Sequence, residues 1–267
     1  MIIDTPGFDD PEKSNSEILT EISRMLSAQY QLGIPLKGII YLHRISDVRF
    51  TGAAVHALSI FTKICGEDAL SNVLFVTTRW HEVDESLGAS REKELRENFW
   101  AYMLAKGSQM NRFRGDKGSA IGIVSQLLGK ADIVLEIQQE LVVDNMALDQ
   151  TNAGFAIKDE ITDSKEQYQR DLAELEKLRK SLKKTDKAIK KIERDVAGER
   201  AKLDRAARDE ERLKRKIANE TFQEIPSIYM SAFTADTVYT NKKKFVVCHT
   251  ECRYQALHSP SQATKCV

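Results

Sequence analysis

The feature that most constrains the fold is a long series of apolar residues spaced seven positions apart in the second half of the chain. Between 159 and 220 charged residues dominate, and no proline interrupts the pattern. The series consists of Ile161, Tyr168, Leu175, Leu182, Ile189, Val196, Leu203 and Ile217. Only Glu210 breaks it. Because sustained heptads with charged flanks are typical of coiled coils, 159–220 is predicted to form a coiled-coil helix.

A second heptad register supports this prediction less regularly. It holds the apolar Leu178, Ile192, Ala206 and Leu213, but also Thr185 and Glu199. Gly198 could act as a hinge, but the main register passes through it unchanged, which favours a single rod, on the order of 90 Å long, over a hairpin. The alternative is a solvated single helix held by charge pairs. A coiled coil would bind a second copy of the chain or another protein.

Residues 1–150 have the pattern of an α/β domain. Continuous apolar runs at 2–3, 38–42 and 72–76 are typical of strands buried on both faces of a parallel sheet, and 112–113 could add a short last strand. The predicted helices are 14–30, 51–65, 91–106, 120–128 and 132–148. Strands that alternate with helices in this way predict a doubly wound sheet.

The remaining residues, 221–267, form a mixed tail. The run 244–248 could be a strand, and the rest is rich in Ser, Thr, Gln and Ala and could be disordered. A zinc interpretation is invited by Cys248, His249 and Cys252, together with His258 and Cys266. The second half, however, lacks a paired spacing of ligands. Scattered thiols are therefore the favoured interpretation.

Composition argues against some classes of function. The chain has 267 residues, with 40 lysines and arginines against 40 acids, so its formal net charge is zero. This balance argues against a globally basic nucleic-acid binder, although a local basic patch stays open, and no specific nucleic-acid partner is expected. No stretch has the pattern of a signal peptide, and none is long and apolar enough to predict a transmembrane segment. We expect a cytoplasmic protein with reduced thiols.

The motif that carries chemistry is Asp4-Thr5-Pro6-Gly7, which follows the apolar residues 2–3. In P-loop GTPases a strand ends in D-x-x-G: the aspartate reaches Mg²⁺ through a water, and the glycine offers its backbone N–H to the terminal phosphate. Loss of that phosphate frees the glycine, and the helix after it moves. Alone the motif is a weak signal, because Asp4 and Gly7 could simply end a strand at a surface turn. Its position after an apolar strand and before two further buried strands makes it fairly strong.

Several segments resemble one family of proteins. IIDTPGFDD, GIIYLHRISDVRFTGAA, NVLFVTTRWHEV and REKELRENFW are similar to the septin-like branch of the P-loop GTPases, specifically to the immunity-associated, avirulence-induced-gene-type GTPases. The resemblance covers roughly 1–150 and implies a partial P-loop GTPase fold, GTP binding with Mg²⁺, and slow hydrolysis. It places Asp4 at the metal and Gly7 at the terminal phosphate. It places Thr78, Arg79 and His81 in the base-recognition loop.

The chain departs from the family pattern in three places. No G-x-x-x-x-G-K-[ST] phosphate loop occurs, so we expect a chain truncated at its amino end, with the first strand, first helix and first switch before Met1. His81 stands where relatives carry an aspartate that reads guanine, which leaves base selectivity open. Phe8 stands where Ras-like enzymes carry a water-orienting glutamine, which implies slow or assisted hydrolysis.

The predicted truncation has a structural consequence. In the GTPase sheet the missing first strand lies between the strand that ends at Asp4 and the strand 38–42. We expect either that these two strands close up and pair directly or that 2–3 detaches. Both outcomes would expose apolar surface or loosen packing, so the chain is expected to be marginally stable alone.

Two functions therefore compete. The first is the family role of GTP binding and slow hydrolysis, which would need the missing amino-terminal part. The second is a nucleotide-independent interaction protein, in which the coiled coil assembles partners and the G-like domain is inert. Arg44 and Asp47, at the end of the second predicted strand, are expected to form a structural pair on the side where such sheets bind nucleotides.

Overall fold

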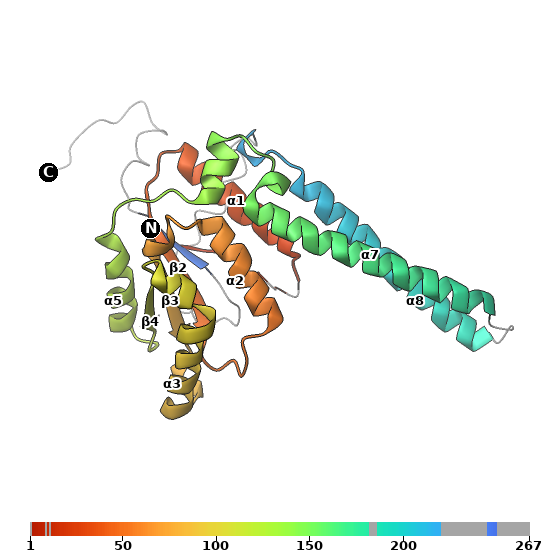
Figure 1. Cartoon of the computed structure of the whole chain (residues 1–267), viewed down its shortest axis with the longest axis horizontal. Helices are drawn as coiled ribbons and strands as arrows, with labels where there is room; N and C mark the ends of the chain where they lie inside the picture. Colours follow the sequence, from red (N-terminus) through yellow and green to blue (C-terminus); the bar gives the residue numbers. More distant parts are fainter. Residues whose placement is uncertain (1, 9, 11, 182–185, 220–244, 250–267) are drawn as a thin grey trace, which may run out of the picture.

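The computed structural model describes residues 2–8, 10, 12–181, 186–219 and 245–249 of the chain (Figure 1). These residues form a mixed α/β structure around one sheet. The strands are β1 Ile2–Asp4, β2 Leu36–Arg44, β3 Val73–Thr78, β4 Gln109–Arg112 and β5 Phe245–His249. Their order across the sheet is β1-β5-β2-β3-β4. β2, β3 and β4 run parallel. The unbroken apolar runs predicted this for β2 and β3, whereas the last strand lies at Gln109–Arg112 and not at the predicted 112–113.

The expected gap in the sheet is filled by β5, which runs antiparallel to both neighbours. Val247 pairs with Ile3 on one side and with Ile39 on the other. The expectations that β1 would pair directly with β2, or that 2–3 would detach, are both wrong. A strand from far along the chain satisfies the backbone N–H and C=O groups that the gap would have left unpaired. β1 and β2 therefore run in the same direction, with one strand between them.

Helices cover both faces of the sheet (Figure 1). They are α1 Asn15–Gln31, α2 Gly52–Cys65, α3 Glu85–Glu94, α4 Ala101–Ala105, α5 Lys117–Leu128, α6 Glu136–Gln138, α7 Asn152–Ser181 and α8 Asp186–Leu213. The larger hydrophobic cluster packs α1 and α2 on one face around buried residues such as Ile18, Phe61 and Phe75. On the other face Ile123 and Leu127 of α5 pack against β2 and β3. This arrangement fits the predicted, partial doubly wound sheet.

Local sequence signals explain where the first helices begin and end. The Ser14 hydroxyl accepts from the backbone N–H of Glu17 at 3.3 Å, and the Glu17 carboxylate accepts from the N–H of Ser14 at 3.0 Å. This reciprocal capping box starts α1 close to the predicted position. Gly66, with φ 74°, ends α2 where the sequence predicted.

Two later helices differ from their predictions. The helix predicted at 91–106 already begins at Glu85, and a π-type turn at Leu95–Phe99 separates α3 from α4. The earlier start includes Gly88, although glycine is unfavourable inside a helix. The helix predicted at 132–148 is wrong in extent, because only Glu136–Gln138 is α-helical and another π-type turn follows at Gln139–Val143.

The predicted single rod is also wrong. The segment belongs to two helices, α7 and α8, that pack against each other antiparallel (Figure 1). Three ion pairs join them in reversed sequence order: Lys165–Glu210 at 2.6 Å, Glu176–Arg200 at 3.4 Å and Arg179–Glu193 at 3.8 Å. The heptad pattern could not decide this point, because it specifies an apolar face without specifying which helix covers it. Gly198 lies inside α8 and is not the hinge.

Part of the apolar face of this α7–α8 hairpin is covered within the same chain, while Leu178 is exposed. Ile161, Ile192, Val196 and Ala206 are buried. One end of the hairpin packs against α1 and α2, and the other end extends beyond the sheet (Figure 1). The predicted tail lies outside the described residues except for β5, where the predicted strand at 244–248 is confirmed with a shift of one residue. Among the described helices, none is long and apolar enough to cross a membrane.

Candidate functional site

The residues predicted to bind a nucleotide lie along one edge of the sheet, where strands of the same direction end. Asp4 ends β1, Arg44 ends β2 and Thr78 ends β3. Open α/β sheets bind ligands beside the carboxyl ends of their strands. β5 and β2 lie between Asp4 and Thr78. The sheet thus brings the D-x-x-G turn and the predicted base-recognition loop to one edge but does not bring them into contact.

The D-x-x-G turn leads from β1 toward α1. Asp4 is half-buried and Gly7 is buried. The Phe8 side chain packs in the main hydrophobic cluster and is 3% exposed, so it offers no group that could orient a water at this edge. Among the residues that the structure describes, no group of three or more His, Cys, Asp or Glu side chains could hold a metal ion. The role of Asp4 as a Mg²⁺ ligand therefore stays a prediction.

The residues predicted to read the base are tied into local structure. Thr78 is buried, and its hydroxyl donates to the carbonyl of His43 at 3.3 Å. Arg79 adopts a left-handed backbone with φ 64°, which is uncommon for a residue with a side chain, and its guanidinium pairs with Glu82. His81 is exposed, with Nε2 3.8 Å from the Glu82 carboxylate. An imidazole can accept one hydrogen bond at most, whereas a carboxylate in its place could accept two from a guanine edge.

Trp80 anchors the same loop in a cluster that the sequence did not reveal. The guanidinium carbon of Arg112 lies 3.9 Å from the Trp80 ring centroid, and Arg112 binds Glu92 at 3.0 Å. The Glu92 carboxylate raises the pKa of Arg112, so this cation stays charged. Gly88 leaves room for the ring, since a Cβ there would lie 2.7 Å from it. Arg112 thereby covers one face of Trp80 that a base could otherwise stack on.

A small cavity lies near the carboxyl end of β2. His43, Asp47 and Phe50 contribute to its wall, and its volume of about 10 Å³ is room for about one water and not for a nucleotide. The predicted pair beside it is confirmed, with Arg44 2.9 Å from Asp47.

A second polar cluster fastens the start of α1 to α8. Asp209 is buried and accepts hydrogen bonds from the hydroxyls of Ser14 and Ser16, both at 2.9 Å. Arg212 donates to Asp209 at 2.6 Å and to Glu17 at 2.9 Å. The hydrogen bond from the backbone N–H of Ser14 helps to hold the pKa of Glu17 below its ordinary value. The helix that follows the D-x-x-G turn is thus held against the hairpin.

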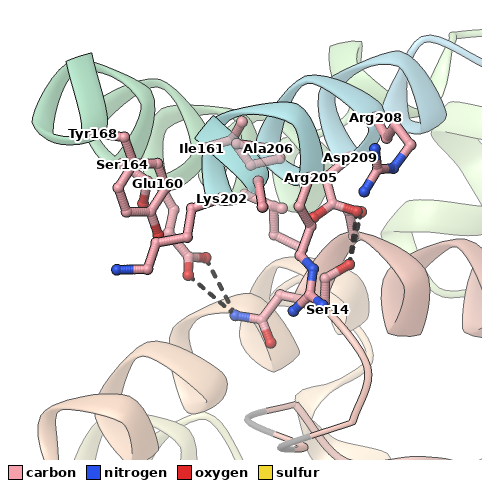
Figure 2. Close-up of a pocket in the computed structure, with 14 residues that line it drawn as sticks. Ser14, Glu160, Ile161, Ser164, Tyr168, Lys202, Arg205, Ala206, Arg208 and Asp209 are labelled. Atoms are coloured by element: carbon pink, nitrogen blue, oxygen red, sulfur yellow. Dashed lines mark hydrogen bonds between the residues drawn. The ribbon is translucent and has the colours of Figure 1, made fainter. Parts of the chain in front are cut away.

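Sequence reasoning found only half of this cluster. Ser14 begins the predicted helix 14–30, but Asp209 lies off both apolar registers and carries no signal of its own. Beside the cluster lies a cleft of about 580 Å³ between the start of α1 and the two helices of the hairpin (Figure 2). Its lining comes from three separate segments of sequence, so no spacing along the chain could have predicted it.

Comparison with models of known protein families finds no match to this chain, and comparison with curated proteins finds none either. The resemblance to P-loop GTPases therefore depends on the residues of the chain itself.

Proposed function

We propose that this chain is a guanine-nucleotide-binding protein of the P-loop GTPase superfamily. The observation that carries the proposal is the geometry of the sheet edge: Asp4 and Thr78 end strands that run in the same direction, with the strand of Arg44 between them. A nucleotide along this edge would meet Asp4 and Gly7 at its phosphates and residues 78–81 at its base. The resemblance of the quoted segments supports the same assignment of roles.

In this proposal Mg²⁺ and residues of the chain have different roles. Mg²⁺ bound with GTP would neutralise the charge of the terminal phosphates. Asp4 would hold the metal through a water, and the backbone N–H of Gly7 would bind the terminal phosphate. Phe8 is buried in the core, so no side chain at its position orients an attacking water. Hydrolysis by this chain is therefore expected to be slow.

The affinity is expected to be well below that of GTPases with a phosphate loop. Backbone amides of a glycine-rich loop make most of the contacts to phosphates in that superfamily, and the sequence contains no such loop with its lysine. In addition, β5 occupies the position between β1 and β2.

The position of β5 between β1 and β2 also favours a second candidate function. The groups that would meet a nucleotide at this sheet edge already contact other parts of the chain. β5 lies between β1 and β2, Arg79 is paired with Glu82, and Arg112 is stacked on Trp80. In this candidate the α/β part is a rigid base and the α7–α8 hairpin is an arm that binds other proteins independently of nucleotide.

Titration with a fluorescent GTP analogue separates the two candidates. Saturable binding that requires Mg²⁺, is competed by GTP better than by ATP, and is lost in Asp4→Ala supports the first. Asp10→Ala is the matched control, because it removes an acid from the same turn region without changing the D-x-x-G motif. Absence of Mg²⁺-dependent binding in the folded wild-type chain would refute the first candidate. The second candidate fails if sedimentation shows a monomer at all concentrations and no partner binds the hairpin.

A further inference from the structure

The cleft beside α1 has a cationic rim. Lys202, Arg205 and Arg208 follow one another at three-residue intervals on α8, so they lie on neighbouring turns of one helix face. Figure 2 shows Arg205 extending from α8 toward the start of α1. The volume of about 580 Å³ falls within the range of small-molecule sites. The cleft is therefore large enough for a ligand and presents positive charge to it.

The two acids that line the cleft already have partners. Glu160 accepts from the side-chain amide of Asn15 at 3.2 Å and lies 3.0 Å from Nε2 of His56. Asp209 is occupied by Ser14, Ser16 and Arg212. Figure 2 shows the side chains of Glu160 and Asp209 at separate places along the cleft. Neither carboxylate is paired with a cation of the rim.

The arginines of the rim are free to bind a ligand. Arg205 and Arg208 are exposed, and neither makes an ion pair or hydrogen bond with any residue in the described part of the chain. Lys202 binds Glu199 at 2.7 Å, and this bond raises the pKa of Lys202. The rim thus offers two planar guanidinium groups, whose N–H donors match the oxygens of a phosphate in pairs, and one ammonium group.

The floor of the cleft is apolar. Ile157, Ile161 and Ala206 contribute aliphatic surface, and the ring of Tyr168 lies beside them, 5.6 Å from the ammonium of Lys202. A floor of this kind favours a ligand with an apolar or aromatic part, because a fully hydrated anion would gain nothing from it.

We propose that this cleft binds a small phosphorylated molecule, with its phosphate on Arg205 and Arg208 and an apolar or aromatic part on the floor beside Tyr168. The site is separate from the sheet edge that carries Asp4 and Thr78. It lies where α1 meets the hairpin, so an occupant would touch both elements.

Calorimetric titration of the full chain with phenyl phosphate tests the proposal, with inorganic phosphate as the probe of charge alone. Saturable binding of phenyl phosphate is expected, tighter than that of inorganic phosphate. The double variant Arg205→Gln/Arg208→Gln should weaken it by about tenfold or more, because both charge-assisted contacts are lost. Both residues are exposed, so the variant should fold as the wild type does.

The matched control is Lys191→Gln/Arg194→Gln, which removes the same charge from exposed positions of α8 outside the cleft. Unchanged binding in this control, and in Asp4→Ala, supports the assigned site. An equal loss in both double variants would show non-specific charge attraction and overturn the proposal. Loss in Asp4→Ala would place the ligand at the sheet edge and also overturn it. Absence of saturable binding, or tighter binding of a poly-glutamate peptide, would refute a phosphorylated small molecule.

Discussion

Replacing Asp209 by alanine should loosen the hairpin from the α/β part of the molecule. The buried carboxylate accepts from Ser14 and Ser16 at 2.9 Å and from Arg212 at 2.6 Å. Hydrogen bonds to a charged group are worth roughly 1.5–3 kcal/mol each. The loss is only partial, because the Ser14 hydroxyl still lies 3.2 Å from that of Ser16 and Arg212 keeps its bond to Glu17. We therefore expect the free energy of unfolding to fall by about 2–3 kcal/mol.

Urea unfolding followed by circular dichroism measures this change, and hydrogen exchange locates it. Amide protection should fall first at the end of α8 and the start of α1. Asp209→Asn keeps an acceptor for the serines and should lose about 1 kcal/mol. Asp204→Ala is the control, since it removes an exposed acid from the same helix. If Asp209→Ala and Asp204→Ala agree within ~0.5 kcal/mol, the cluster does not hold the hairpin and the reasoning is wrong.

Three further predictions test other parts of the structure. Val247→Pro should lower the free energy of unfolding by about 2 kcal/mol or more, because proline removes a backbone donor from a strand paired on both sides. An unchanged melting temperature in thermal unfolding would contradict the pairing of β5. Burial raises the pKa of Glu140, so the native state binds the proton more tightly than the unfolded state, and stability falls as pH rises from the unfolded pKa through the native one. In urea unfolding, the free energy of unfolding of Glu140→Gln should therefore rise relative to that of the wild type as the pH increases from about 4 to about 7. A difference between the two proteins that stays constant across that range would refute this. Gly154→Ala should destabilise α7 strongly, because the new Cβ would lie 1.7 Å from the Leu148 carbonyl oxygen. Gly198→Ala has open space around it and should stabilise α8 by about 0.5–1 kcal/mol. Equal effects of the two variants on the free energy of unfolding in chemical denaturation would argue against both placements.

Much of the fold follows from local patterns in the sequence. Unbroken apolar runs predicted the parallel strands β2 and β3, since strands buried on both faces do not alternate. The helices predicted at 14–30 and 51–65 have boundaries close to those of α1 and α2, because the caps Ser14 and Gly66 act through neighbouring backbone groups. The hairpin could not be predicted, because heptads define a face and not the chain that covers it. The helix predicted at 91–106 begins earlier, at Glu85, and Gly88 within it leaves room for the Trp80 ring, a contact that sequence patterns do not show.

The candidate site was less predictable than the fold. Asp4, Thr78 and Arg79 could be proposed because a resemblance pointed to them, but the pairing of Arg79 with Glu82 and the stacking of Arg112 on Trp80 required coordinates. Arg79 and Glu82 pair within a single turn, whereas Arg112 lies on β4 and reaches Trp80 after β3, a contact that sequence spacing does not encode. The same holds for Asp209, whose partners lie near the other end of the chain.

The position of β5 also sets an order on biosynthesis. Residues 2–4 leave the ribosome long before their sheet neighbour at 245–249. A nascent chain can pair β2 with β3 and β4 well before β1 has a partner. Until then β1 and one side of β2 present unpaired edges, which are the surfaces that chaperones protect and that aggregation exploits. The sheet can therefore be completed only after all of its other strands have been made.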